Sequence, residues 1–346
     1  MNHDTTKNDP ISVGIVGAGS WGTALAEVLA SKGLKTDLWA YEPEVVDQIK
    51  YSRENRFFLP GFSLSENIFP TNDIASVVSG KDMVVVVVPS HFVREITKRI
   101  GSAVSADTII VSASKGIENA THMTMSAVIR DSLPGHPDLK LAVLSGPSFA
   151  REVAGKVPTV ITVAAYESYS AEFVQEVFAT PYFRVYTSHD IIGVELGGSV
   201  KNVIAIAAGI VDGLNLGLNT RAALVTRGLS EIRRLGLKLG ADPRTFTGPA
   251  GLGDLLLTCT GDLSRNHMVG KKIGQGMKLP DILSQMRMVA EGVKTAKSVY
   301  NFSKKLGVEM PIVMATYRIL YEGLSPTEAL HQLMTRDLRH ELDDEY

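Results

Sequence analysis

The first half of the chain alternates short apolar runs with breaks of glycine, proline and hydroxylated residues. Short runs rich in valine and isoleucine are typical of strands that are buried on both faces of a parallel sheet. The clearest run is nearly all valine and comes directly before Pro89. The pattern predicts strands over residues 11–16, 36–41, 82–88, 108–113, 141–144, 157–165 and 183–187.

From about His189 onward the apolar positions recur with helical spacing instead. The pattern predicts helices over residues 191–213, 220–239, 286–306 and 311–320, and a short last helix that begins near Ser325. We therefore expect an α/β protein of two domains. A Rossmann-like doubly wound parallel sheet would occupy residues 1–189, and an all-α domain would follow over residues 190–346.

The long helix at the start of the second domain is apolar on nearly every side, yet it carries Glu195, Lys201 and Asn202. Burying a lysine is costly unless it is paired or loses its proton. The side chain of Lys201 is expected to lean over the turn that holds Gly197 and Gly198, where the missing side chains leave room for another group. The alternative is that Lys201 extends its amine to water along apolar surface.

A glycine-rich turn follows the first predicted strand and precedes a helical pattern. Gly17, Gly19 and Gly22 have the G-x-G-x-x-G spacing, with Ser20 and Trp21 between the last two. These glycines would permit a tight turn and let a pyrophosphate approach the backbone at the helix N-terminus. In this context the motif indicates a dinucleotide site rather than a plain turn.

The second predicted strand ends at Tyr41 and Glu42. An acidic residue about 20 residues after the glycines usually binds the adenine ribose, which favours NAD because a carboxylate repels the 2′-phosphate of NADP. Arg53 and Arg56 are the nearest arginines. The choice between NADP and NAD therefore stays open.

Small, hydroxylated or cationic residues follow the later strands. Lys115 lies between Ser114 and Gly116, and Gly146 and Ser148 follow the strand predicted at 141–144. Ligands of doubly wound sheets bind at the carboxyl ends of the strands, so these residues are candidates for a site. The alternative for Lys115 is a solvated position in a loop.

Two loops in the second domain carry further candidates. Asp254 ends a glycine-rich loop before an apolar run, and Ser264, Arg265 and Asn266 precede a helical stretch. A helix N-terminus with a hydroxyl, a guanidinium and an amide suits a phosphate group. The alternative is ordinary helix capping by Ser264 beside an exposed arginine.

The overall composition excludes several classes of function. With 35 basic against 37 acidic residues, the chain has no global field for nucleic acid or an anionic membrane. Its single cysteine, Cys259, allows no intrachain disulfide and is expected to be a small buried residue. The polar N-terminus lacks the core of a signal peptide, and no uninterrupted apolar run reaches the ~18 residues of a membrane span. We expect a cytoplasmic protein without a metal site.

Several segments, in this order, closely resemble the NAD(P)-dependent glycerol-3-phosphate dehydrogenases of the bacterial type: GAGSWG, VPS, SKGIE, SGPSFA, ELGGSVKNVIAIAAGI, AGLGDLLLTC and SRN. The resemblance runs from about residue 12 to about residue 330. It implies reversible hydride transfer between sn-glycerol 3-phosphate and NAD(P)+, giving dihydroxyacetone phosphate, a step that supplies phospholipid synthesis. One departure is that members preferring NADP often carry a basic residue after the second strand, where this chain has Tyr41 and Glu42.

The resemblance also implies the residues of the site. Contacts with NADP or NAD are implied for Ser20, Trp21, Tyr41, Lys115, Ala150, Arg265, Val289 and Glu291. Contacts with the substrate are implied for Lys115, Gly146, Ser148, Lys201, Asp254, Ser264, Arg265 and Asn266. Lys201 would be the proton acceptor.

The chemistry asks for a base that takes the proton of the substrate's 2-hydroxyl group. A free lysine, with a pKa of about 10.4, is a poor base near neutral pH, but burial and the charge of Lys115 would lower the pKa of Lys201. We expect Lys115 to polarise the carbonyl oxygen, Asp254 to orient Lys201 or bind a substrate hydroxyl, and Asn202 to fix Lys201 or pack beside it. The sequence does not decide which of the two lysines is the base.

Two other functions stay open. The chain could be a dinucleotide-binding redox sensor without catalysis, or a related two-domain, lysine-dependent hydroxy-acid reductase. Whether the chain is a glycerol-3-phosphate dehydrogenase or a hydroxy-acid reductase, we expect it to act on a small-molecule substrate and to form a homodimer.

Overall fold

The computed structural model describes residues 11–286, 288–338 and 340. Within these ranges the strands are β1 Val13–Val16, β2 Thr36–Trp39, β3 Ile68–Thr71, β4 Met83–Val86, β5 Ile109–Ser112, β6 Leu141–Ser145, β7 Thr159–Ala165 and β8 Phe183–Ser188. The longer helices are α1 Ser20–Ala30, α2 Pro43–Ser52, α4 Val93–Ile100, α5 Met125–Ser132, α7 Ser168–Phe178, α8 Ile191–Gly213, α9 Gly217–Lys238, α11 Arg265–Gly274, α13 Glu291–Leu306, α14 Pro311–Tyr321 and α15 Pro326–Met334. The shorter helices are α3 Ile74–Val78, α6 Ala150–Ala154, α10 Asp254–Thr260 and α12 Leu279–Ser284, with single turns at Ser90–Phe92, Pro243–Thr247 and Pro249–Gly253.

The strands form one sheet of eight in the order β3-β2-β1-β4-β5-β6-β7-β8. All neighbouring strands are parallel except β6 and β7, which pair antiparallel. The order reverses direction at β1, so the ends of β1 and β4 face a crevice of the kind in which doubly wound sheets bind ligands. The predicted doubly wound sheet is confirmed, with one antiparallel pair added.

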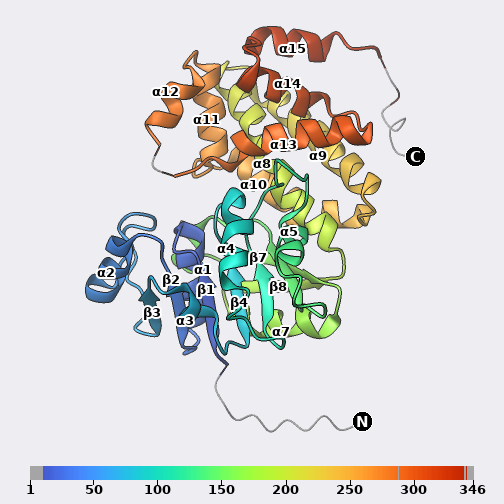
Figure 1. Cartoon of the computed structure of the whole chain (residues 1–346). Helices are drawn as coiled ribbons and strands as arrows, with labels where there is room; N and C mark the ends of the chain where they lie inside the picture. The colour runs from blue at the N-terminus through green and yellow to red at the C-terminus, as the bar shows by residue number, and fades with distance from the viewer. Residues whose placement is uncertain (1–10, 287, 339, 341–346) are drawn as a thin grey trace.

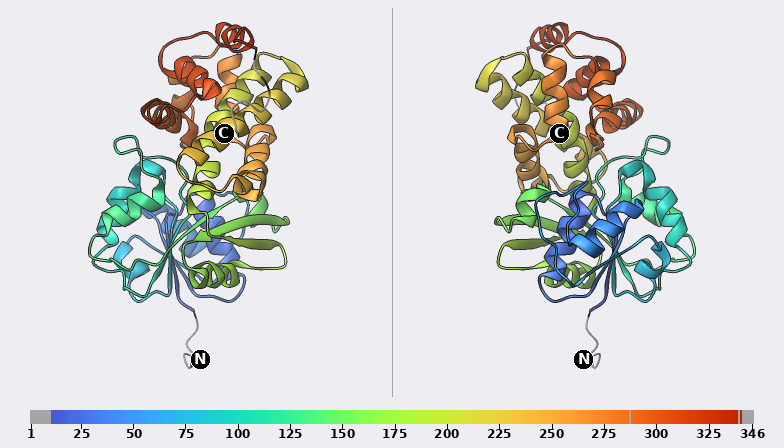
Figure 2. Two further views of the ribbon diagram at one scale, coloured as in Figure 1. Left: turned by 90° about the vertical axis from the view of Figure 1, so that its right-hand side faces the viewer. Right: turned by 90° about the vertical axis from the view of Figure 1, so that its left-hand side faces the viewer.

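Helices cover both faces of this sheet (Figure 2). One apolar core joins Ile15 and Val85 of the strands to α1, α2 and α7, while the other joins Val84 and Val86 to α3, α4 and α5. Because successive side chains in a strand point to opposite faces, an unbroken valine run can serve both cores at once. This explains why the central strands β1, β4 and β5 consist mainly of valine and isoleucine.

The second half of the chain is helical, and α8 lies at its centre, between the sheet and the outer helices (Figure 1). Nearly all residues of α8 are buried, and Leu196, Val203 and Ile206 belong to the apolar core of this half. By length and composition α8 could cross a membrane, with a mean hydropathy of 1.5 over its apolar window, but 94% of that window is buried by the protein itself. The predicted bounds of this helix are confirmed.

Several elements differ from the prediction, among them β3, α2 and α13. We did not predict β3, which contains Pro70 and pairs only with β2 at the edge of the sheet, a position where the missing N–H of proline is tolerated. We also did not predict α2, in which only Val45 and Ile49 are buried, so its apolar face is narrow. Helix α13 begins at Glu291 and not at residue 286, because Ala290 has an extended backbone and precedes the first turn.

Candidate active site

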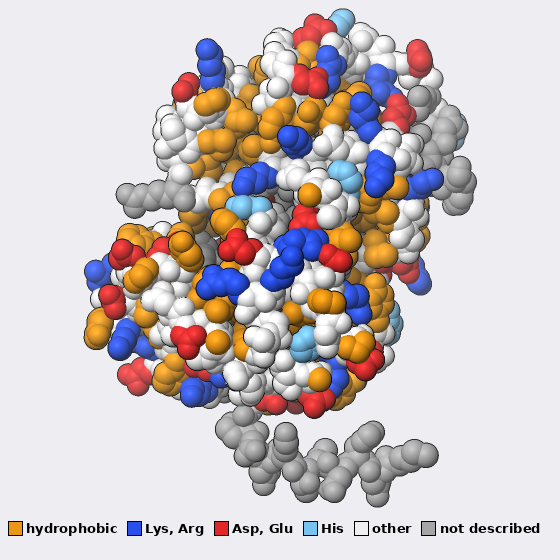
Figure 3. Space-filling view, in the orientation of Figure 1, with side chains coloured by type: hydrophobic (Ala, Val, Ile, Leu, Met, Phe, Trp, Pro, Cys, Tyr) orange, Lys and Arg blue, Asp and Glu red, His pale blue; other side chains and the backbone are white. Residues whose placement is uncertain are grey.

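Charged side chains of both signs gather where the two halves of the molecule meet (Figure 3). At this junction the carboxyl ends of β5 and β6 face α8 and α10. The loop after β5 delivers Lys115, α8 delivers Lys201, and α10 begins with Asp254. Residues from three separate parts of the sequence thus converge on one point.

Asp254 bridges the two lysines. Its Oδ2 atom lies 2.7 Å from Nζ of Lys115, and its Oδ1 atom accepts a hydrogen bond from Nζ of Lys201. Asp254 is only 1% exposed and Lys201 only 6%, whereas the side chain of Lys115 keeps 20% of its surface in contact with solvent. The alternative in which Lys201 extends to water is therefore wrong. We call Lys115, Asp254 and Lys201 the lysine–aspartate cluster.

The pKa of Lys201 is lowered to about 8, and burial is the main cause because it penalises the charged ammonium. The positive charge of Lys115 lowers the pKa further, while the carboxylate of Asp254 raises it. Burial and Lys115 thus act in the expected direction. At this pKa the amine can both accept and release a proton near neutral pH, as a group that serves a reversible reaction must.

Thr258 is a member of the site that we did not predict. Its Oγ1 atom accepts a hydrogen bond from Nζ of Lys201 at 2.8 Å and lies 2.6 Å from the carbonyl oxygen of Asp254, to which it donates. Thr258 comes four residues after Asp254 in α10, so both side chains lie on the same face of the helix. This spacing was available in the sequence and could have identified it.

The two glycines beneath Lys201 leave room for other parts of the site. A Cβ atom on Gly197 would lie 2.4 Å from the carbonyl oxygen of Ala250, and one on Gly198 would lie 2.4 Å from Oγ of Ser145 and 3.5 Å from the side chain of Lys115. The space predicted there is thus occupied by the loop before Asp254 and by Lys115 itself. The glycines let α8 approach the sheet closely.

Gly146 and Ser148 lie beside Lys115. The carbonyl oxygen of Gly146 accepts hydrogen bonds from Nζ of Lys115 at 3.3 Å and from Oγ of Ser148 at 3.0 Å. Gly146 has φ +152°, and a Cβ atom there would lie 2.8 Å from Cα of Ile161. The structure therefore brings together five of the residues that the resemblance implies for one site: Lys115, Gly146, Ser148, Lys201 and Asp254.

The segment from Ser264 to Asn266 forms the beginning of α11. Ser264 is the predicted N-cap, since its Oγ atom accepts a hydrogen bond from the backbone N–H of His267 at 3.2 Å. Arg265 is exposed, while Asn266 is buried and donates to Oδ1 of Asn202 at 2.9 Å. Asn202 therefore binds Asn266 and does not fix Lys201, so that part of the prediction is wrong.

Helix α11 is held against α8 at very short range. A Cβ atom on Gly270 would lie 1.9 Å from the carbonyl oxygen of Ile206, and one on Gly209 would lie 2.0 Å from that of His267. The two backbones touch through these glycines, a feature we call the α8–α11 glycine contact. It fixes the start of α11 relative to Lys201.

The glycine-rich turn between β1 and α1 is built as the motif predicts. Gly17 has φ +124°, and a Cβ atom on Gly22 would lie 1.8 Å from the carbonyl oxygen of Gly17, so neither position accepts a side chain. Gly19, in contrast, has no atom of the described residues within 4 Å of the position of a Cβ atom, apart from its own neighbours in the chain. The protein itself does not require a glycine there, but a ligand that approaches the backbone would.

Trp21 supports the same interpretation. Its indole Nε1 atom is buried and has no hydrogen-bond partner among the described residues. An unsatisfied buried donor at the first turn of α1 suits the phosphate oxygens of a dinucleotide. The residues of this turn thus fit the predicted cofactor.

The other predicted cofactor residues surround this turn. Ser20 donates to the carbonyl oxygen of Phe58 at 2.5 Å and lies 3.3 Å from Sδ of Met288, which places the segment before α13 against the turn. Val289 follows Met288 and is 37% exposed. Ala150 begins α6, which packs against α1.

Glu291, the first residue of α13, links the helical half to the sheet half. Its Oε2 atom accepts a hydrogen bond from Oγ of Ser90 at 2.8 Å, and a Cβ atom on Gly116 would lie 2.5 Å from Cβ of Ser90. Burial raises the pKa of Glu291, and the nearby charge of Arg265 counteracts part of this effect. Arg265 and Glu291 therefore lie close to each other, as expected if both contact one ligand.

Tyr41 lies apart from these residues at the end of β2 and is 74% exposed. Arg53 donates to the carbonyl oxygens of Ile68 and Ser65, and Arg56 donates to Oε2 of Glu54 at 3.1 Å. Both arginines thus have partners within the protein. The role predicted for Tyr41 and Glu42 in binding a cofactor therefore stays a prediction.

Cys259 is fully buried in α10, and burial raises the pKa of its thiol to about 12. The expectation of a small buried residue is confirmed. Among the described residues, no group of three or more histidine, cysteine, aspartate or glutamate side chains could hold a metal ion.

Family models match both halves of the chain. Residues 12–171 match the N-terminal model of NAD-dependent glycerol-3-phosphate dehydrogenase, and residues 190–331 match its C-terminal model. The glycerol-3-phosphate dehydrogenase [NAD(P)+] of Syntrophobacter fumaroxidans is 54% identical over 331 residues, which cover 96% of this chain and 97% of that protein. The enzyme of the same name from Citrifermentans bemidjiense is 56% identical over 329 residues, or 95% and 98% of the two chains.

Solved structures agree with these matches. The crystal structure of glycerol-3-phosphate dehydrogenase from Coxiella burnetii superimposes with a TM-score of 0.91 at 40% identity, covering 94% of this chain and 99% of that one. A ketopantoate reductase from Ralstonia eutropha matches with a TM-score of 0.53 at 15% identity, over 93% of this chain and 100% of that one. The second likeness concerns the fold alone.

Proposed function

Because the chain belongs to the NAD-dependent glycerol-3-phosphate dehydrogenase family, we propose that it transfers hydride reversibly between sn-glycerol 3-phosphate and NAD(P)+. The products are dihydroxyacetone phosphate and NAD(P)H. The observation that carries the proposal is the lysine–aspartate cluster, which lies where the sheet and the helical half meet. The cluster has two cations and one anion, so it favours a substrate oxygen that becomes negative during the reaction.

Lys201 is the group that exchanges the proton. With a pKa of about 8 it takes the proton of the 2-hydroxyl group during oxidation and returns it during reduction. Thr258 and Asp254 hold its amine by two hydrogen bonds, which fix the direction of transfer. Lys115 also binds Asp254, and from there its charge polarises the substrate's oxygen at C2.

The phosphate group of the substrate would bind at the start of α11. Ser264, Arg265 and Asn266 supply a hydroxyl group, a guanidinium and an amide at a helix N-terminus, whose partial positive charge favours an anion. Because α11 touches α8 through glycines, the phosphate site and Lys201 keep a fixed separation. Gly146 and Ser148 would contact the substrate from the sheet side.

NAD(P), when bound, supplies the group that accepts or donates hydride. The glycine-rich turn, Ser20 and Trp21 would hold its pyrophosphate, and Tyr41 and Glu42 would lie at its adenosine end. Lys115, Ala150, Arg265, Val289 and Glu291 would enclose the nicotinamide end. The division into two domains is proposed between residues 189 and 190, because the last strand, β8, ends at Ser188 and the long helix α8 begins at Ile191.

The cellular role follows from the product. We propose a cytoplasmic homodimer that acts on small molecules without binding nucleic acid or membranes and supplies glycerol 3-phosphate for phospholipid synthesis. The near-balanced charge supports the absence of nucleic-acid and membrane partners.

The deciding experiment is the initial rate of NADPH and of NADH oxidation with dihydroxyacetone phosphate, followed by the absorbance of the reduced nicotinamide. We expect turnover with the phosphorylated ketone and at least a hundredfold lower kcat/KM with dihydroxyacetone, which lacks the phosphate. Equal turnover of a hydroxy acid without phosphate would favour the hydroxy-acid reductase instead. Dinucleotide binding without turnover of any substrate would favour the redox sensor.

A further inference from the structure

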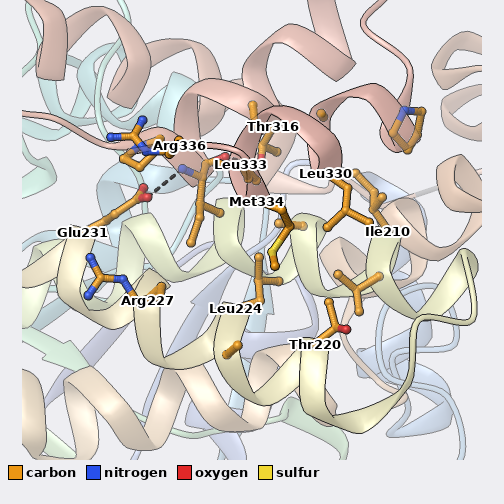
Figure 4. A pocket seen from close by; sticks show the side chains of 18 of the residues that line it. Ile210, Thr220, Leu224, Arg227, Glu231, Thr316, Leu330, Leu333, Met334 and Arg336 are labelled. Carbon is orange, nitrogen blue, oxygen red and sulfur yellow. Dashed lines mark hydrogen bonds between the residues drawn. The ribbon is translucent and has the colours of Figure 1, made fainter. Parts of the chain in front are cut away.

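A cavity of about 390 Å³ lies in the helical half, away from the lysine–aspartate cluster, between α8, α9, α14 and α15. Its size falls in the range of sites for small organic ligands. Most of its wall is apolar and is formed by Ile210, Leu224, Ile319, Leu330, Leu333 and Met334. Figure 4 shows these helices around the open space, with Leu224, Leu330 and Met334 directed into it.

The cavity leaves the apolar side of α15 incompletely packed. Leu330 and Leu333 are only half-buried, and Met334 is 76% exposed, although all three line the cavity. An apolar space of this size forfeits dispersion contacts and does not hold water well, because its wall offers few hydrogen-bond partners. An apolar ligand would supply the contacts that α15 lacks.

One end of the cavity is charged. Figure 4 shows Arg227, Glu231 and Arg336 together at this end. Glu231 is buried, and its two carboxylate oxygens accept hydrogen bonds from the backbone N–H groups of Ile312 at 2.6 Å and Val313 at 3.1 Å. Its carboxylate is therefore engaged by the N-terminus of α14.

Arg336 supplies the donor for a ligand at this end. It donates from Nη2 to Oε1 of Glu309, and a guanidinium has five N–H donors in all. Its side chain is 34% exposed, so its other N–H groups can reach a group at the mouth of the cavity. A planar guanidinium suits a carboxylate or a phosphate better than an uncharged head.

From this arrangement we propose that the cavity binds a single-chain amphiphile, with its alkyl chain among the apolar side chains and an anionic head group at Arg336. The ligand would touch α8 at Ala207 and Ile210. Ala207 lies six positions after Lys201 in the same helix, or about 9 Å along its axis. The site is nevertheless separate from the reaction, and binding can be measured without any turnover.

The first test is calorimetric titration of the full chain with sodium dodecanoate below its micelle concentration. We expect saturable binding, and about tenfold weaker binding of decanoate, because two fewer methylene groups are buried. Absence of saturable dodecanoate binding to the wild-type protein would overturn the proposal.

A pair of neighbouring substitutions on α9 locates the site. Ala223 lines the cavity, so Ala223→Trp fills it and should weaken dodecanoate binding at least tenfold. Ala222 is also exposed on α9 but does not line the cavity, so Ala222→Trp is the matched control and should leave binding unchanged. Equal affinity of the two variants would show that dodecanoate binds elsewhere and would refute the assignment.

A second pair of measurements tests the head group. Arg336→Gln should weaken dodecanoate binding about fivefold and leave the binding of uncharged dodecanol unchanged. If dodecyltrimethylammonium binds as tightly as dodecanoate, the anionic part of the proposal is wrong.

Discussion

Two regions of the helical half each bury a carboxylate, and they use it differently. In the lysine–aspartate cluster Asp254 binds two ammonium groups, one of them with a pKa lowered to about 8. At the start of α14, Glu231 binds two backbone N–H groups, which do not titrate. Burial alone therefore does not distinguish the two carboxylates, whereas their partners do: Asp254 binds amines that can give up a proton, and Glu231 binds backbone N–H groups that cannot.

The pKa of Glu231 shows what burial without a titratable partner does. Burial raises it to about 7, although the two backbone hydrogen bonds and the charges of Arg234 and Arg227 act in the opposite direction. The same penalty acts on Lys201 with the opposite sign, because burial disfavours whichever form is charged. Four predictions test this difference, from the largest effect to the smallest.

The largest effect should come from Lys201→Ala. Removing the proton acceptor should lower kcat by about a thousandfold or more, because general-base catalysis commonly contributes 10²–10⁴. Dinucleotide affinity, measured by fluorescence titration, should change less than about twofold. Lys305→Ala is the matched control, since Lys305 is exposed at the end of α13. A Lys201→Ala enzyme that keeps most of its turnover would exclude this lysine as the base.

Asp254→Asn should lower kcat about a hundredfold, because Lys201 and Lys115 lose the carboxylate that orients them. Asp254 raises the pKa of Lys201, so its loss should also move the acidic limb of the oxidation profile to lower pH. The measurement is kcat against pH for glycerol 3-phosphate oxidation. A limb that stays in place would show that Asp254 does not act on the titrating group.

The Glu231 region should respond in stability instead. Since its pKa is raised in the folded state, Glu231 contributes stability that is complete below its unfolded pKa and is lost as the pH rises through about 7. Between pH 5 and pH 8 the loss should be about 2 kcal/mol, measured as the free energy of unfolding in urea. Glu231→Gln should flatten this dependence and leave kcat within about twofold of wild type. Equal slopes in the two proteins would contradict the assignment.

The smallest effect is the pH dependence of the wild-type enzyme. Oxidation needs neutral Lys201, so kcat/KM for glycerol 3-phosphate should rise about tenfold per pH unit below pH 8 and level off above it. Reduction of dihydroxyacetone phosphate needs the protonated amine and should decline above the same pH. We expect the oxidation profile to rise and the reduction profile to fall with pH around the same midpoint. Two profiles that change in the same direction would exclude Lys201 as the one group that governs both reactions.

Much of the fold was predictable because its signals are local. Runs of valine and isoleucine mark the central strands of the sheet, and the glycine spacing from Gly17 to Gly22 marks the turn into α1. In contrast, β3 depends on pairing with β2, and Pro70 obscures it. Helix α2 has only two buried residues, so its apolar pattern was too weak to identify.

For the site, the candidate residues were predictable but their pairings were not. The sequence gives no sign that Asp254 joins Lys115 to Lys201, because the three are far apart in the chain and meet only through packing. The same reason explains why the partner of Asn202 was not predicted, since Asn266 lies on another helix. Thr258 could have been found from its spacing to Asp254, since both lie in one helix.

The α8–α11 glycine contact has a consequence for how the specificity of such an enzyme can evolve. The separation of the proposed base Lys201 from the proposed phosphate site at the start of α11 is set by two backbones in contact, so no side-chain replacement can lengthen it gradually. Acceptance of a longer substrate would require rebuilding both helices together. The coenzyme end is different, because Tyr41 is exposed and its replacement disturbs no core. We therefore expect the fold to fix the length of the substrate, whereas single substitutions near Tyr41 can change the coenzyme preference.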